Sequence, residues 1–382
     1  MTDDMVNLDD VRRPTISADE PPALFEVAPE TEEHWWGLPE CSMENAAPQR
    51  RITVNFTSHD DVREFAERLG TDLTANADSL WWPPQQRLRP REYVWRGTPS
   101  ETRYPVYIPS KGRADVETTG ALLRQAGVTP WWVVEPQEAD AYRARYGDRV
   151  LVLPFANLGQ GSIPARNWIW EHAKEHGHRW HWIMDDNILG FWRLHANRRL
   201  VVEQSSAPLR VVEDFADRYD NLALAGLSAD GFAPDRVRTP PVVWNTRVYS
   251  VTLIRTDLPY RWRGRYNEDT DLCLRILKDG WATALIKAML MKKAHTARSG
   301  GVGGMKGGNT DNVYHTEDYR RAFAESLKEQ HPDVTEVVWK FGRWHHQVDY
   351  SPFAGNKPQL RPGVTPRGDF DDYGLTLRRG NV

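Results

Sequence analysis

Two groups of acidic residues have the types and spacing that could bind a metal or move a proton. Asp185, Asp186 and Asn187 directly follow the apolar residues 182–184. Hard oxygen ligands of this kind suit Mg²⁺ or Mn²⁺ bound to a diphosphate. The alternative interpretation is structural, because an Asx turn often closes a strand.

The second group is Asn267-Glu268-Asp269-Thr270-Asp271, which precedes apolar residues at helical spacing. A carboxylate at this place could act as the general base toward an acceptor hydroxyl. The alternative is that these acids only stabilise the N-terminus of a helix, by capping and through the helix dipole.

A third pattern, Gly161-Ser-Ile-Pro-Ala-Arg166-Asn167, opens a predicted helix. A helix N-terminus that carries an arginine and an asparagine can hold an anionic or ribosyl ligand. The alternative is a solvent-facing cap with a surface arginine.

These residues need a scaffold that brings them together, and residues 103–187 predict one. Strands are expected over 104–108, 131–134, 150–153 and 179–184, and helices over 116–126, 137–146 and 164–176. This alternation indicates an α/β fold with a mainly parallel central sheet and flanking helices. Because ligands bind at the carboxyl ends of parallel strands, the loop 109–113, Glu135 and residues 185–187 should meet there.

The rest of the chain divides by composition. The acidic residues 1–33 predict a disordered tail. Residues 34–97 predict a small α+β unit for docking or substrate presentation, in which Ser58 and Asp61 cap a helix that ends at Gly70. A large domain is expected over 103–350, and the polar, Pro- and Gly-rich segment 354–382 is expected to be poorly ordered.

Composition excludes several classes of protein. The 382 residues carry 49 Lys and Arg and 53 Asp and Glu, a net charge of −4. Two cysteines cannot form a disulfide framework, no apolar run reaches the roughly 20 residues of a membrane span, and the N-terminus lacks signal-peptide features, so a cytoplasmic protein is expected. Residues 255–306 hold 11 basic and 5 acidic residues, which suits a nucleotide diphosphate or nucleic acid, or simply a solvated basic face.

The order of these motifs resembles a known family. The segment GSIPARNWIWEHAKEHGHRWHWIMDDN resembles the nucleotide-sugar-binding half of GT-A glycosyltransferases, and NEDTDLCLRILKDG resembles their acceptor-side motif. Together with YIPSKGR, LPF, NTRVYS, RWRGRYNEDTDL and GGNTD, these motifs resemble the TET-associated glycosyltransferases of phages over residues 103–310. The resemblance implies a GT-A-like, Rossmann-like fold. It also implies transfer of a sugar from a nucleotide sugar, a UDP-sugar, to 5-hydroxymethylcytosine or a related hydroxymethylpyrimidine in phage DNA, in the host cytoplasm.

The same resemblance assigns roles to residues. Asp269, or Glu268 beside it, would be the catalytic base. The metal would be held by Asp185, Asp186 and Asn187, with His295 as a late ligand and His315 as the second choice. Because Asn187 stands where the DxD pattern has Asp, Asp186 is expected to carry more of the metal binding.

The remaining assignments concern the donor and the DNA. The donor pocket would include Pro109, Ser110, Lys111, Arg113, Glu135, Arg166, Asn167 and Asp185. The DNA contacts would be Arg261, Arg263 and Arg265 for phosphates, and Trp262 and Tyr266 for an unstacked base. The Gly-rich loop 299–308 with Lys306 would close over the diphosphate.

Two other functions stay open at this point. One is a GT-A glycosyltransferase with a protein or polysaccharide acceptor. The other is a non-catalytic DNA-binding or assembly protein on a degenerate transferase domain, which the Asn187 departure allows. The sequence does not determine the sugar, the stereochemical outcome or the oligomeric state.

Overall fold

The computed structural model describes residues 35, 37–43, 50, 52–71, 73, 80, 82, 92–234, 238–294, 319–340, 342–365 and 368–380. Its helices are α1 (His59–Leu69), α2 (Thr119–Ala126), α3 (Ala139–Tyr146), α4 (Ile163–Glu175), α5 (Ala207–Ala216), α6 (Glu268–Lys278) and α8 (Tyr319–Gln330). Its strands are β1 (Tyr93–Arg96), β2 (Val106–Pro109), β3 (Trp131–Val134), β4 (Val150–Val152), β5 (Trp180–Met184), β6 (Ile188–His195), β7 (Arg198–Glu203), β8 (Leu222–Ala229), β9 (Val242–Trp244), β10 (Val251–Arg255), β11 (Ala282–Lys293), β12 (Thr335–Lys340), β13 (Arg343–Val348) and β14 (Thr376–Arg379).

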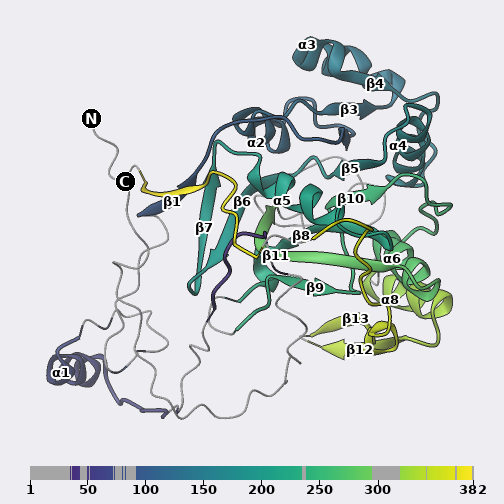
Figure 1. Cartoon of the computed structure of the whole chain (residues 1–382). Coiled ribbons are helices and arrows are strands. Elements are labelled where there is room, and N and C mark those ends of the chain that lie inside the picture. Colours follow the sequence, from purple (N-terminus) through teal and green to yellow (C-terminus); the bar gives the residue numbers. More distant parts are fainter. Residues whose placement is uncertain are drawn as a thin grey trace.

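A 12-stranded sheet runs through the described part in the order β14-β1-β7-β6-β11-β8-β10-β5-β2-β3-β4, with β9 beside β11 (Figure 1). Strands β5, β2, β3 and β4 are parallel neighbours. Helices α2, α3 and α4 connect them, as parallel strands require a crossover. The predicted mixed α/β fold with flanking helices is confirmed, with element boundaries within three residues of those expected in this half.

The expectation of a mainly parallel sheet is correct only for this half. Strand β10 lies antiparallel between β5 and β8, and β11 is parallel to β8 but antiparallel to β6 and β9. Strands β6 and β7 form an antiparallel hairpin through Ala196 and Asn197, whose φ angles are 47° and 57°. A two-residue turn with positive φ angles joins adjacent antiparallel strands, whereas parallel strands need a long connection.

The segments that flank the large domain, 34–97 and 354–382, both contribute to its sheet or core, which the sequence did not predict. Strand β1, at the end of the expected accessory unit, pairs with β7 and β14 of the large sheet, and Leu38 is fully buried in the main core. Strand β14 lies within the segment expected to be poorly ordered, and Leu375 and Leu377 are buried there. These apolar side chains cover the sheet at its edge, which the polar composition around them did not reveal. Helix α1 begins at the predicted capping box of Ser58 and Asp61.

The sheet has an apolar cluster on each face. Val106 and Ile108 of β2 belong to one cluster and Tyr107 belongs to the other, because successive strand residues point to opposite faces. Helices α2 and α5 contribute to the first cluster, and α4 and α6 contribute to the second. Helices fixed on both faces in this way hold the loops at the strand ends in place.

A smaller group of elements packs on α6. Leu274 and Leu277 of α6 form an apolar cluster with Leu327 of α8, Val334 and Phe353. Strands β12 and β13 pair with each other as a separate two-stranded ribbon (Figure 1). No helix of the described residues is long and apolar enough to cross a membrane.

Candidate active site

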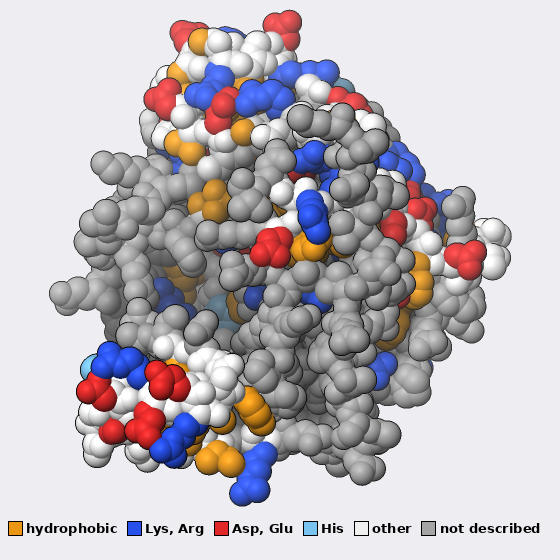
Figure 2. Space-filling view, turned by 90° about the vertical axis from the view of Figure 1, so that its left-hand side faces the viewer, with side chains coloured by type: hydrophobic (Ala, Val, Ile, Leu, Met, Phe, Trp, Pro, Cys, Tyr) orange, Lys and Arg blue, Asp and Glu red, His pale blue; other side chains and the backbone are white. Residues whose placement is uncertain are grey.

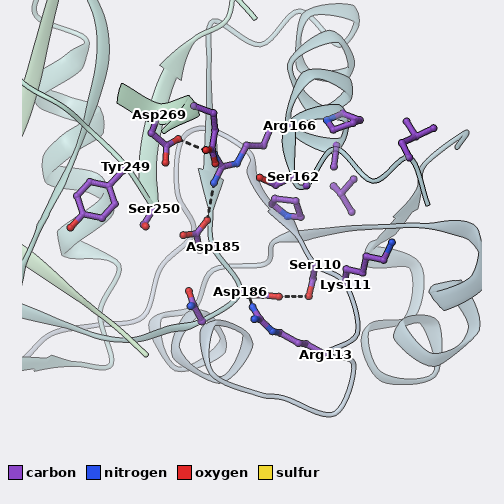
Figure 3. A pocket seen from close by; sticks show the side chains of 18 of the residues that line it. Ser110, Lys111, Arg113, Ser162, Arg166, Asp185, Asp186, Tyr249, Ser250 and Asp269 are labelled. Atoms are coloured by element: carbon purple, nitrogen blue, oxygen red, sulfur yellow. Dashed lines mark hydrogen bonds and ion pairs between the residues drawn. The ribbon is translucent and has the colours of Figure 1, made fainter. Parts of the chain in front are cut away.

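A cavity of about 310 Å³ opens at the carboxyl ends of β2, β3 and β5 and at the N-termini of α4 and α6 (Figure 3). Most of the predicted site residues line it, namely Pro109, Ser110, Lys111, Arg113, Glu135, Arg166, Asp185, Asp186, Asn187, Glu268 and Asp269. The cavity thus combines all three sequence patterns. Several other lining residues have no role predicted from the sequence, among them Arg247, Tyr249, Ser250, Lys293 and Phe323.

Arg166 joins the donor-side and acceptor-side motifs. It lies in the first turn of α4 and is only 6% exposed, so the interpretation as a surface arginine is wrong. Its guanidinium donates to Asp185 at 3.1 Å, to Glu268 at 3.2 Å and to Asp269 at 2.8 Å (Figure 3). One buried cation therefore holds three carboxylates in place, one from residues 185–187 and two from residues 267–271.

Lys293, at the end of β11, is a second cation in the cavity. Its Nζ donates to Asp185 at 2.5 Å and to the Ser250 hydroxyl at 3.1 Å. Burial alone would raise the pKa of Asp185, but Lys293 and Arg166 hold that pKa well below its usual value. Asp185 is therefore ionised at neutral pH. Lys293 lies 108 residues from its partner, and the only sequence signal was a charge at the end of an apolar run.

Asp186 points away from Asp185. It accepts hydrogen bonds from the Ser110 hydroxyl at 2.6 Å and from Arg113 at 2.5 Å, and Ser110 also shares a hydrogen bond with the Tyr142 hydroxyl at 2.7 Å. Burial raises the pKa of Asp186, and Arg113 opposes that shift. Arg166 and Lys293 bind Asp185, whereas Ser110 and Arg113 bind Asp186, so the two carboxylates face different partners. The geometry therefore does not favour the expectation that Asp186 carries more of the metal binding.

The residues that fit a metal are Asp185 and Asn187, which are two positions apart. The side-chain Oδ1 of Asn187 is buried and has no hydrogen-bond partner among the described residues, and its Nδ2 lies 3.5 Å from the Ala294 carbonyl. A carboxylate and a carboxamide oxygen are ligands that Mg²⁺ and Mn²⁺ accept. The described residues contain no group of three or more His, Cys, Asp or Glu that could hold a metal. His295, His315 and the loop 299–308 with Lys306 lie outside the described residues.

The acceptor-side acids begin helix α6. The preceding residue, Asn267, has a φ of 55° and donates from its side chain to the Phe323 carbonyl at 2.7 Å. Burial and the neighbouring Asp269 raise the pKa of Glu268, whereas Arg166 opposes the shift. Asp269 accepts from Arg166 and, at 3.3 Å, from the Trp262 indole. The carboxylates of Glu268 and Asp269 thus line the cavity at a place that a hydroxyl group could approach.

The structure corrects several expected contacts. Trp262 is only 3% exposed and packs edge-on against Trp170, so it positions Asp269 and is not available to stack on a base. Asn167 does not line the cavity, because its side chain bonds the backbone of Trp262 at 2.9 Å and 2.8 Å. Arg261 is bound to Glu171 and lies over Trp170, which makes it a link to α4.

Arg263 and Arg265, in the same loop before α6, have different contacts. Arg263 forms an ion pair at 3.0 Å with the buried Asp271, although its own side chain is 53% exposed. Arg265 lies over the Tyr266 ring, and Tyr266 stacks on Phe323 with ring centroids 4.2 Å apart. Because Phe323 lines the cavity, Arg265 and Tyr266 lie beside the end of the cavity at the N-terminus of α6.

The opposite end of the cavity is formed by Lys111 and Glu135. The Lys111 ammonium donates to Glu135 at 2.7 Å and to Asn157 at 2.9 Å. Lys111 and its partners therefore place a cation and a carboxylate at the ends of β2 and β3. Such groups can receive the phosphates and hydroxyls of a nucleotide.

The chain was compared with protein families, curated proteins and solved structures. Residues 104–304 match the family described as TET-associated glycosyltransferase. A crystal structure of GalNAc-T7 with UDP, GalNAc and Mn²⁺ is similar at a TM-score of 0.35 and 13% identity, and the match covers 78% of this chain. The chain spans 63% of the GalNAc-T7 chain that it matches. The comparison with curated proteins found no match.

The family match covers more than half of the chain. It includes every residue that lines the cavity except Phe323. The chain belongs to the TET-associated glycosyltransferase family.

Proposed function

We propose that this protein transfers a sugar from a nucleotide sugar, a UDP-sugar, to the hydroxymethyl group of 5-hydroxymethylcytosine or a related base in DNA. The observation that carries the proposal is the position of Arg166, which binds Asp185 on the donor side and Glu268 and Asp269 on the acceptor side. Family membership supports sugar transfer, and the resemblance to phage enzymes supports the hydroxymethylated base.

The donor would lie along the ends of β2, β3 and β5. Lys111 and Arg113 would contact its nucleotide part, and Arg166 and Lys293 would face its diphosphate. Asp185 and Asn187 would hold a divalent metal, which supplies Lewis-acid stabilisation of a leaving diphosphate when bound. To make room, Lys293 would exchange part of its contact with Asp185 for a phosphate oxygen, since an ammonium can serve either anion.

The acceptor would approach from the N-terminus of α6. Asp269 would take the proton from the hydroxymethyl oxygen, because Arg166 and Trp262 hold one of its oxygens and fix the orientation of the carboxylate. The new bond joins that oxygen to the anomeric carbon. The bond from this carbon to the diphosphate oxygen breaks, and its electron pair leaves with the diphosphate. In duplex DNA the base must leave the stack to reach the site.

The experiment that tests the proposal is mass spectrometry of nucleosides. DNA containing 5-hydroxymethylcytosine is incubated with the protein, Mn²⁺ and a panel of nucleotide sugars, with unmodified DNA as the control. A sugar mass added only to the hydroxymethylated nucleoside supports the proposal. Donor binding without any transfer would point to a protein or polysaccharide acceptor, and absence of both would point to a non-catalytic role.

A further inference from the structure

The ribbon of β12 and β13 lies outside the part of the chain that matches the family. In its register Trp339 lies opposite Trp344, and Lys340 lies opposite Arg343. Directly opposite residues of an antiparallel pair share a face. The two tryptophans therefore lie on one face at the tip, and the two cations lie on the other.

The aromatic side of this tip is incompletely covered. Trp339 is 59% exposed, although its ring packs edge-on against Trp344 with centroids 5.2 Å apart. Arg321 of α8 lies over Trp344 at 5.4 Å, so Trp344 is held while Trp339 extends beyond it. The aromatic face thus presents the exposed Trp339 ring next to Trp344 and Arg321, where a flat ring of a partner could stack.

On the charged face of the tip, the described hydrogen bonds give Lys340 and Arg343 no anionic partner. Like charges directly opposite each other destabilise a strand pair. Lys340 donates to Gln347 and Arg343 donates to His345 at 3.1 Å, so the described hydrogen bonds of these cations go to uncharged or weakly basic groups. An anion between Lys340 and Arg343 would remove their mutual repulsion.

The ribbon is connected to the active-site cavity by its neighbours. It packs beside α8 (Figure 1), and Phe323 of α8 lines the cavity and stacks on Tyr266. His346 lies on the same ribbon face as Trp344, and its pKa is lowered by burial and by Arg247, which also lines the cavity. The aromatic face of the ribbon is thus next to the acceptor end of the site.

We propose that the tip of this ribbon, with Trp339, Lys340, Arg343 and Trp344, binds the DNA strand that carries the acceptor base. The strand would cross the tip of the ribbon, so that Lys340 and Arg343 contact phosphates on one face and Trp339 stacks on a base or sugar on the other. This inference rests on the proposed function. In Figure 2, the described Lys and Arg side chains are interspersed with Asp and Glu, and these described residues form no continuous basic surface.

The test compares DNA affinity and transfer in matched variants. Trp339→Ala should weaken binding of fluorescent DNA about tenfold, as loss of one stacked base does, and Trp339→Phe should restore most of it. Lys340→Ala with Arg343→Ala should lower the slope of log affinity against log salt by about two. Trp82→Ala removes an equally exposed tryptophan, 62% exposed, outside the ribbon and should change neither quantity.

Two further readouts separate this inference from the proposed function. All variants should hydrolyse the nucleotide sugar without acceptor at the wild-type rate, and should raise KM for DNA more than they lower kcat. If wild-type protein binds and glycosylates DNA but Trp339→Ala and the double variant match it, the ribbon inference is wrong and the proposed function stands. If the wild-type protein neither binds nor modifies DNA, the proposed function fails and the ribbon inference fails with it. Variants that lose binding to anionic vesicles but keep full DNA affinity would overturn it in favour of a lipid surface.

Discussion

The pKa values of Asp185 on the donor side and Glu268 on the acceptor side are shifted in opposite directions, although both carboxylates bind Arg166. Asp185 has its pKa held low because Lys293 and Arg166 outweigh its burial. Glu268 has its pKa raised because burial and the neighbouring Asp269 outweigh Arg166. A carboxylate with two cations is suited to hold charge permanently, whereas a pair of acids that share one cation is suited to exchange a proton.

The strongest test of the acceptor side is Asp269→Asn. It keeps the shape of the side chain but removes the base, so transfer should fall about 10²- to 10⁴-fold with little change in donor affinity. Glu268→Gln should cost less, since Glu268 is the less exposed of the pair. Steady-state kinetics with hydroxymethylated DNA measures both. A larger loss for Glu268→Gln would exchange their roles.

The link between the two sides is tested by Arg166→Met. Three carboxylates would lose their shared partner, so transfer should fall about 100- to 1,000-fold. Removing one member of a buried ion network should also lower the free energy of unfolding by about 3–5 kcal/mol. Urea unfolding and donor binding should be measured on the same preparation. Unchanged stability would mean that the carboxylates are neutralised without this arginine.

A matched pair of lysine variants tests the role of Lys293 on the donor side. Lys293→Met removes the ammonium that contacts Asp185 and should raise KM for the nucleotide sugar about 10- to 100-fold, the range for a hydrogen bond to a charged group. Lys292→Met should have no such effect, because Lys292 is exposed and lies over the Trp192 ring. Equal effects of the two variants would contradict the assignment of Lys293.

The smallest expected effect concerns the pH dependence of stability in metal-free buffer. A raised pKa means that folded Glu268 holds its proton more tightly, so stability is lost as the pH rises above its ordinary value of 4.5. Glu268→Gln removes that loss, and its stability relative to wild type should rise between pH 4.5 and neutrality.

Asp185→Asn should show the reverse. Its lowered pKa means that Asp185 stabilises the fold above its ordinary value of 3.8, and this contribution disappears as the pH falls below 3.8. Urea unfolding across this pH range checks both variants. If both showed the same trend, the two sides of the cavity would not differ in the way their pKa shifts indicate.

Local sequence patterns determined the elements around the site. Alternating strands and helices of residues 103–187 predicted a parallel unit, and the acids Asp185, Asp186, Glu268 and Asp269 of the two motifs line one cavity. These predictions succeeded because helix and strand periodicity and the position of strand ends are local properties.

Only the tertiary structure decided which partner each side chain has. Lys293 reaches Asp185 across 108 residues because β11 runs antiparallel to β6, and no local pattern encodes that neighbour. Trp262 is buried and Asn167 is hydrogen-bonded to the Trp262 backbone, so both support the loop before α6 and are not the ligand contacts expected. The residue types and their order therefore come from the sequence. The direction of each side chain and its pKa depend on packing between distant segments, which set its distance from opposite charges and from water.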